Sequence, residues 1–310
     1  MSPPRVASLL PSATEMVAAV GMADHLVGVS HECDWPPEVV GLPVLTSTRL
    51  RLSPSSSRID RDVRELLREA LAVYEVDTEA LRAARPDVIV TQDLCDVCAV
   101  SLADVQRAVA ETLSPGVRIV NLHPTRLAEI WEDLLAVGRA LGRGAEAEAA
   151  LAVLQQRVES VRLRAAARPH RPAVLCIEWL DPVMVAGTWG PELVELAGGV
   201  PLVTRAGQHA PTLQRDELAA LDPAPEVVLV KPCGFKLERT LAEAAVLEAL
   251  FEGLPWPALR EGRVYLADGN AYFNRPGPRI ADSLEILAAC LHPEEFPELA
   301  ERHARAWRRL

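Results

Sequence analysis

The sequence lacks any apolar run of the length that crosses a membrane. A transmembrane helix needs about 18 or more consecutive apolar residues, and the first apolar run, Val6–Leu10, is broken by Pro11. The preceding segment, Met1–Arg5, does not have the basic start and long apolar stretch of a secretory signal. We therefore expect a cytoplasmic protein without membrane insertion.

Familiar catalytic motifs are also missing. The segment Gly28–Glu32 lacks the second glycine of a nucleophile elbow. The pair His31-Glu32 lacks the later histidine of a zinc-protease helix. The segment Gly142–Ala147 has glycines spaced as in a dinucleotide-binding loop, but it joins two predicted helices instead of following a strand. These segments therefore do not indicate a familiar catalytic class.

Positive charge is in deficit, with 32 Lys and Arg residues against 43 Asp and Glu residues and a net charge of −11. Such a balance argues against a nucleic-acid or anionic-membrane partner. The length of 310 residues suggests about two domains. A hydrophobic content of 49% with 24% charged residues is ordinary for a globular protein.

Strand-like runs alternate with helical segments along both halves of the chain. Two of them, Ala80–Gln92 and Glu217–Cys233, share one pattern of short helix, proline turn, acidic residue and apolar strand. The predicted strands are Val6–Leu10, Leu26–Ser30, Asp87–Thr91, Arg118–Leu122, Ala173–Trp179, Glu226–Val230 and Arg263–Leu266. This alternation predicts an α/β fold with mostly parallel sheets that helices cover on both faces.

The segment Ala145–Ala167 contains no glycine or proline and lies between the two halves. At 1.5 Å per residue it predicts a helix of about 35 Å, which would act as a stiff connector. We therefore predict two Rossmann-like lobes, at 1–142 and 169–310, joined by one long backbone helix at 143–168.

Three local patterns carry further expectations. Ser12 and Glu15 have the spacing of a capping box, which predicts a helix that starts at Ser12 and that Gly21 ends. The polar, proline-containing segment Ser53–Ser57 predicts a surface loop. The last residues, Glu294–Arg309, have an amphipathic pattern that predicts a terminal helix.

Four cysteines follow predicted strands: Cys33, Cys95, Cys98 and Cys233. Thiolates select zinc, copper(I) or iron–sulfur clusters, and four of them complete a ligand shell. The alternative is that free cysteines are small buried hydrophobic residues. We prefer that alternative for Cys176 and Cys290 and keep both interpretations open for the four.

Aromatic residues make up only 4% of the chain, yet several fall in predicted loops. They are Trp35, Trp189, Phe235, Tyr272 and Phe273. A flat, largely apolar ligand would bind against such walls, whereas the alternative is that each ring closes the edge of a core. Ser12 at a helix start, the loop residues His31 and His209, and Arg275 and Arg279 are further polar candidates.

Several segments together resemble one known family. They are Arg5–Glu15, Val27–Ser30, Trp35-Pro36-Pro37, Arg85–Val90, Gly187–Gly199 and Phe273–Ile280. In this order, over nearly the whole length, the chain resembles the cobalamin-type (class III, helical-backbone) substrate-binding proteins of bacterial ABC importers. The resemblance implies two α/β lobes on one long helix, with a corrinoid, haem or iron chelate in the cleft between them.

By position in that family, the loops that line the cleft contain Trp35, Trp189, Tyr272, Phe273 and Arg275. The cysteines are not required in the family and resemble those of an intracellular, cysteine-containing branch. Because no export signal is evident, an ABC importer is an unlikely partner.

From this resemblance and the loop aromatic residues we expect a binding protein for a cobalamin-like corrinoid or another metal chelate, without catalytic turnover. One alternative is a zinc or iron–sulfur centre held across the cleft by the four cysteines, with a structural or redox role. Another is a thiol-dependent corrinoid-processing enzyme that uses Cys95 and Cys98.

Overall fold

The computed structural model describes residues 2–50, 53, 55–68, 73–93, 102–112 and 116–310. The chain forms two compact units. The N-terminal unit consists of Met1–Leu52, Arg61–Pro124 and Ala128–Val153, and the C-terminal unit of Ser53–Asp60, Thr125–Leu127 and Leu154–Leu310. The lobe boundaries expected from the sequence stay a prediction.

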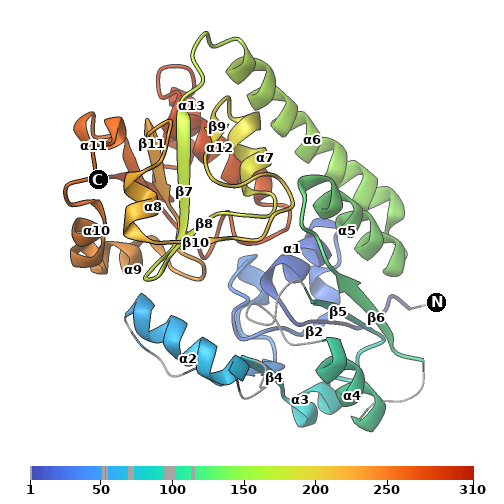
Figure 1. Cartoon of the computed structure of the whole chain (residues 1–310). Coiled ribbons are helices and arrows are strands. Elements are labelled where there is room, and N and C mark those ends of the chain that lie inside the picture. The colour runs from blue at the N-terminus through green and yellow to red at the C-terminus, as the bar shows by residue number, and fades with distance from the viewer. Residues whose placement is uncertain (1, 51–52, 54, 69–72, 94–101, 113–115) are drawn as a thin grey trace. The chain divides into compact units, whose positions relative to one another are not determined.

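The N-terminal unit is built on a parallel sheet with the strand order β2-β1-β5-β6. Its strands are β1 (Val6–Ser8), β2 (Leu26–Gly28), β5 (Val88–Gln92) and β6 (Arg118–Leu122). Helices α1 (Pro11–Ala19) and α5 (Leu127–Ala140) lie on one side of this sheet, and α3 (Thr78–Ala84) and α4 (Leu102–Thr112) on the other (Figure 1). The apolar strands are therefore covered on both faces, as their composition predicts.

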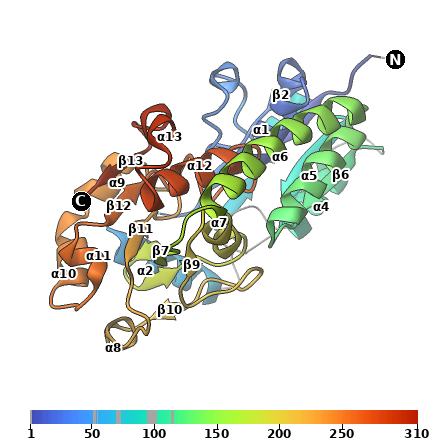
Figure 2. The same cartoon turned by 90° about the horizontal axis from the view of Figure 1, so that it is seen from above.

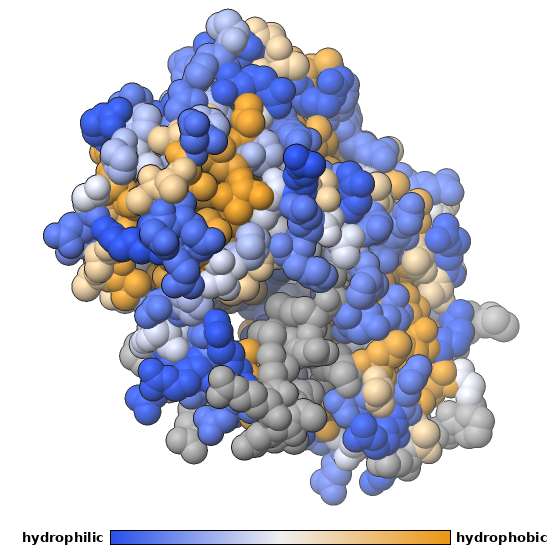
Figure 3. Space-filling view, in the orientation of Figure 1, coloured by the Kyte–Doolittle hydropathy of each residue, from blue (hydrophilic) through white to orange (hydrophobic). Residues whose placement is uncertain are grey.

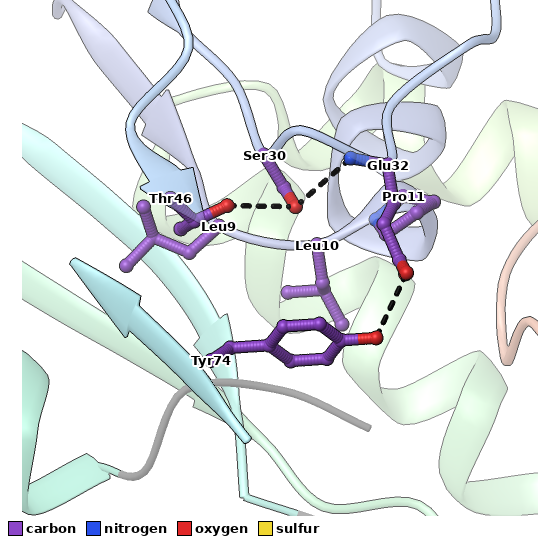
Figure 4. A pocket seen from close by; sticks show the side chains of 7 residues that line it. All are labelled: Leu9, Leu10, Pro11, Ser30, Glu32, Thr46 and Tyr74. Atoms are coloured by element: carbon purple, nitrogen blue, oxygen red, sulfur yellow. Dashed lines mark hydrogen bonds between the residues drawn. The ribbon is translucent and has the colours of Figure 1, made fainter. Parts of the chain in front are cut away.

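A two-stranded antiparallel sheet adds to the N-terminal unit. Its strands are β3 (Thr46–Thr48) and β4 (Tyr74–Val76). They bring Thr46 and Tyr74 to the end of the main sheet where β1 and β2 finish, as the close-up in Figure 4 shows.

The C-terminal unit contains a larger mixed sheet with the strand order β10-β8-β7-β11-β12-β13, and β9 pairs with β7. The strands are β7 (Ala173–Leu180), β8 (Val183–Val185), β9 (Val200–Pro201), β10 (Thr212–Leu213), β11 (Val227–Val230), β12 (Val264–Ala267) and β13 (Trp307–Arg309). The central strands β7, β11 and β12 are parallel, and β8 and β13 pair antiparallel at the flanks.

Helices cover both faces of that sheet. In Figure 1 α7 (Gly190–Leu196) and α12 (Ile280–Leu291) lie on one side, and α10 (Ala244–Phe251) and α11 (Pro257–Arg260) on the other. The remaining helices of this unit are α8 (Arg215–Ala219), α9 (Leu237–Ala242) and α13 (Pro297–Arg302). Alternate strand residues such as Leu175, Val228 and Val264 pack with Trp256 in one buried core.

Helix α6 (Gly144–Ala166) is 23 residues long and unbroken (Figure 2), within one residue of the predicted bounds. The mixed α/β architecture with a parallel sheet and a long helix confirms the predicted fold class. Helix α2 (Ser56–Arg68) begins inside the segment that was expected to be a loop. In Figure 3 hydrophilic side chains cover most of the visible face, and apolar patches lie between them.

Two local predictions are wrong. Helix α1 begins at Pro11, and its N-cap is Leu10 without a side-chain hydrogen bond, so Ser12 and Glu15 form no capping box. Proline is favoured at the first position of a helix because its φ is already helical and its missing N–H is not needed there. The predicted terminal helix is interrupted as well, because the last residues form β13 along the open edge of β12.

Within the described ranges we find no helix with both the length and the apolar content that a bilayer requires.

Candidate functional site

In the N-terminal unit, four parallel strands end at one edge of the sheet. The segments that follow contain Leu9–Ser12 after β1, which includes the start of α1, Ser30–Cys33 after β2, Asp93 after β5 and His123 after β6. Ligands of α/β sheets bind at this edge, where the strands' carboxyl ends open into loops. We call it the N-terminal strand-end edge.

A small pocket opens at this edge (Figure 4). It is lined by Leu9, Leu10, Pro11, Ser30, Glu32, Thr46 and Tyr74. Its volume of about 10 Å³ is at the lower limit for one water molecule. The pocket can therefore hold only one small group, and both apolar and hydrogen-bonding side chains line it.

A hydrogen-bond network fixes the loop after β2. The hydroxyl of Thr46 donates to Ser30 Oγ at 3.0 Å. The backbone N–H of His31 donates to the oxygen of Thr46 at 3.1 Å, and the ring atom Nδ1 of His31 lies 2.7 Å from it. Figure 4 shows Thr46 and Ser30 joined in this way across the pocket.

Tyr74 forms another wall of the pocket. Its hydroxyl donates to the carboxylate of Glu32 at 2.8 Å (Figure 4). The ring of His31 meets the ring of Tyr74 edge to face, with 5.1 Å between the centroids. Burial lowers the pKa of His31, although Glu32 opposes that change. The imidazole is therefore neutral at physiological pH.

The thiol of Cys33 lies beside the start of α1. Its Sγ is 3.0 Å from Thr14 Oγ1, and that hydroxyl also donates to Ser8 Oγ at 2.8 Å. Ser12 is buried, and its hydroxyl has no hydrogen-bond partner among the described residues. Ser12 and Cys33, both predicted site residues, thus belong to the same edge.

An acid–histidine pair occupies the other end of this edge. His123 Nδ1 lies 2.8 Å from Asp93 Oδ1. Burial raises the pKa of Asp93, but hydrogen bonds from Asn121 and His123 outweigh it and leave that pKa below its usual value. The pair holds the His123 ring, whose side chain remains 58% exposed.

The C-terminal unit has a corresponding edge where β7, β11 and β12 end, the C-terminal strand-end edge. The ammonium group of Lys231 is buried there, 3.2 Å from a carboxylate oxygen of Glu178 and 2.7 Å from Asn274 Oδ1. A buried lysine keeps its charge only with such partners. Cys233 follows two residues later and is exposed.

Hydrogen bonds from Asn274 and Trp189 hold the loop after β12 in place. The side-chain amide of Asn274 donates to the carbonyl oxygens of Lys231 and Gly269. The indole N–H of Trp189 donates to the carbonyl of Phe273 at 2.8 Å, and Phe273 has a φ of +63°. A positive φ is strained for a bulky residue, and such strain often occurs at ligand-binding loops.

Most of the predicted aromatic residues of this unit are packed inside it. Phe235 is 2% exposed and lies between Trp179, at 5.2 Å, and the guanidinium of Arg239, at 3.9 Å. Trp189, Phe273 and Arg275 are buried as well. Their present role is to shape the loops, and their contact with a ligand stays a prediction.

Two predicted aromatic residues keep exposed surface. Trp35 is 44% exposed in the loop after β2. Tyr272 is partly exposed, and the guanidinium of Arg279 lies 5.2 Å from the centre of its ring. These two side chains, one on each unit, expose aromatic surface.

The four-cysteine metal site stays a prediction. Cys33 belongs to the N-terminal unit and Cys233 to the C-terminal unit, whereas Cys95 and Cys98 lie outside the described residues. In the described part of the chain, the one cluster with three metal-binding side chains is Asp282, Glu285 and His303. Arg157 already pairs with both of its carboxylates, so the cluster is an ion-pair network.

Sequence reasoning missed Thr46, Tyr74, Lys231 and Asn274. Thr46 and Tyr74 come from short strands with no motif, so only the folded chain brings them to the pocket. The sequence did contain a signal for Lys231. A single charge directly after the apolar run Val227–Val230 is costly to bury unless a partner compensates it, which marks the position as a candidate.

Comparison with known proteins identifies a matching family. The family described as "Periplasmic binding protein" matches residues 6–271. A vitamin B12-binding protein of Vibrio cholerae is 23% identical over 289 residues, which are 93% of this chain and 88% of that protein. An ABC transporter substrate-binding lipoprotein of Bacillus subtilis is 18% identical over 96% of this chain and 82% of its own length.

Solved structures agree with this match. A periplasmic heme-binding protein from Pseudomonas aeruginosa has a TM-score of 0.70 and 25% identity, with 94% of each chain covered. A periplasmic vitamin B12-binding protein of Vibrio cholerae has a TM-score of 0.64 and 19% identity, with 94% of this chain and 98% of that chain covered.

These matches overturn two expectations. The predicted cytoplasmic location is wrong, because the matching proteins are periplasmic or lipoprotein components and point to a place outside the cytoplasm. The expectation that an ABC importer is an unlikely partner is wrong for the same reason. The first residues of the chain do not decide either question.

Proposed function

The chain belongs to the periplasmic binding protein family, and on that premise we propose that it captures a metal chelate of the corrinoid or haem type without catalytic turnover. One observation carries the proposal. The relatives that match more than nine-tenths of this chain include binders of both vitamin B12 and heme, two metal-centred macrocycles of similar flat shape.

The two strand-end edges support this substrate class. The N-terminal edge combines apolar side chains, Leu9 and Leu10, with the ring of Tyr74. Trp35 and Tyr272 offer exposed aromatic surface. Flat apolar macrocycles bind to such walls, while a few polar groups set their orientation. We propose that aromatic and apolar surface of this kind contacts the ligand, and that a cobalamin-like corrinoid is the preferred ligand.

We further propose that the protein delivers this ligand to an ABC importer. The Bacillus subtilis relative is named as such a component. A delivery protein must release its ligand unchanged, so we expect cobalamin recovered after binding to be chemically intact.

Calorimetric titration with cobalamin, cobinamide and hemin tests the proposal. We expect at least one of them to bind with one-to-one stoichiometry and to co-elute with the protein in gel filtration. Absence of heat and of co-elution for all three would contradict it.

A matched pair of variants locates the contact. Trp35→Ala removes an exposed ring at the N-terminal edge and should weaken binding roughly tenfold, because an aromatic wall contributes on the order of 1 kcal/mol. Leu163→Ala removes an exposed apolar side chain on α6, 56% exposed, and should leave affinity unchanged.

A further inference from the structure

His31 follows β2 at the N-terminal strand-end edge, beside the pocket. Its ring is half-buried between Thr46, 2.7 Å from Nδ1, and Tyr74, whose ring centre is 5.1 Å away. The ring is therefore held at one nitrogen and along one side. The second nitrogen, Nε2, carries either a proton or a lone pair, depending on the tautomer of the ring.

The hydrogen bonds of Thr46 decide the tautomer of His31. A hydroxyl has one hydrogen to donate and two lone pairs to accept with. The hydrogen of Thr46 goes to Ser30 Oγ, so its lone pairs face the backbone N–H and the Nδ1 atom of His31. The contact with the ring is then a donation from Nδ1–H, and in a neutral imidazole Nε2 is left with a free lone pair.

We propose that His31 Nε2 is an axial ligand of the metal in the bound chelate. This inference rests on the proposed function, because the metal is part of the substrate. Neutral imidazole is a good ligand for the cobalt of a corrinoid or the iron of a haem. Binding exchanges one axial water of the metal for Nε2 and changes no oxidation state.

The surroundings of His31 match those of a metal-binding histidine. Such residues commonly donate their other ring N–H to a fixed acceptor, which sets the ring orientation. Thr46 supplies that acceptor, and the contact with Tyr74 restricts rotation of the ring. The carboxylate of Glu32 accepts a hydrogen bond from Tyr74, and the partner of His31 Nδ1 is Thr46.

His123 offers a matched control at the same edge. Its Nδ1 is also held, by Asp93 at 2.8 Å, but its side chain is 58% exposed, and it follows β6, at the other end of the strand order from β2. If a position on this edge were sufficient for metal binding, His31 and His123 would be equivalent. The contacts with Thr46 and Tyr74 distinguish His31 from His123.

Electron paramagnetic resonance of bound cob(II)inamide tests the proposal. Cobinamide has no nitrogenous axial base of its own, so a triplet splitting of its cobalt lines requires a protein nitrogen. Tag-free protein in imidazole-free buffer is needed. We expect the triplet in the wild-type protein and in His123→Ala, and its loss in His31→Ala with binding weakened on the order of a hundredfold. Thr46→Val should weaken binding about tenfold, because it removes the acceptor that fixes the ring of the metal-binding histidine.

The outcomes separate the two claims. A wild-type complex without the triplet, or a triplet that persists in His31→Ala, overturns the role of His31 and leaves the proposed function standing. Loss of the triplet in His123→Ala alone would transfer the role to His123. If cobalamin, cobinamide and hemin all fail to bind the wild-type protein, both claims fail together.

Discussion

The carboxylate of Glu243 accepts two hydrogen bonds from Ser56, one from the backbone N–H and one from the hydroxyl, both at 2.7 Å. Both side chains are buried, and 187 residues separate them in sequence. Ser56 is the first residue of α2, so Glu243 supplies a capping acceptor from α10's N-cap position. The contact lies within the C-terminal unit.

Replacing Glu243 by alanine should destabilise the C-terminal unit. The change removes an acceptor for the first turn of α2 and leaves the buried hydroxyl of Ser56 unpaired, which costs about 1–2 kcal/mol. Chemical denaturation measures the loss, and hydrogen exchange at the Ser56 amide should become faster. Glu238→Ala, an exposed glutamate on α9, is the control, and an equal effect in both variants would contradict the capping role.

Acid should weaken the C-terminal unit through Glu285. Burial raises its pKa, but hydrogen bonds from His303 and Arg157 outweigh this and bring it to about 2. Because the folded pKa is depressed, the stabilisation is present above the unfolded pKa, near 4, and disappears as the pH falls toward 2. Glu285→Gln should cost about 2 kcal/mol at neutral pH and flatten the acid limb of a denaturation series. Glu301→Gln, an exposed neighbour on α13, should keep the wild-type profile.

Asp133 on α5 should have the opposite pH dependence. Burial raises its pKa to about 7, with help from Glu129 and Glu132 and a smaller opposing effect from His123. The folded chain therefore keeps a proton that the unfolded chain releases near pH 4, so stability falls as the pH rises through this window.

The Asp133→Asn variant removes that penalty. Its stability advantage over the wild-type protein should grow from about pH 4 to about pH 7 and reach about 2 kcal/mol, after a discount for partial exposure of the carboxyl group. Denaturation midpoints at several pH values provide the measurement. Glu148→Gln, an exposed carboxylate on α6, is the comparison, and a pH-independent difference for Asp133→Asn would rule out this explanation.

Lys231 should matter to both stability and binding. Lys231→Met leaves Glu178 without its ion-pair partner and Asn274 without a donor, which should cost about 2–4 kcal/mol. The loop that contains Tyr272 and Phe273 should then loosen, and affinity for the chelate should fall about tenfold. Lys236→Met removes an exposed lysine nearby and should change neither quantity. Unchanged affinity in a folded Lys231→Met protein would show that the loop does not depend on this contact.

Periodicity in the sequence was sufficient to place the main strands and α6. Apolar runs such as Val88–Gln92 can only be buried, and the absence of glycine and proline in α6 left it no other local structure. Local rules failed at the helix start near Ser12 and at the chain end. There, Pro11 and the open edge of β12 outcompeted the capping and amphipathic patterns.

The sequence by itself determined the α/β class, the long helix and the two sets of strand ends, because these follow from the periodic burial of apolar side chains along neighbouring residues. Tertiary structure alone decided which polar groups meet: Ser30 with Thr46, Glu32 with Tyr74, and Lys231 with Asn274. Such pairs join residues far apart in the chain, and a buried polar group takes whichever partner the fold brings within hydrogen-bonding distance.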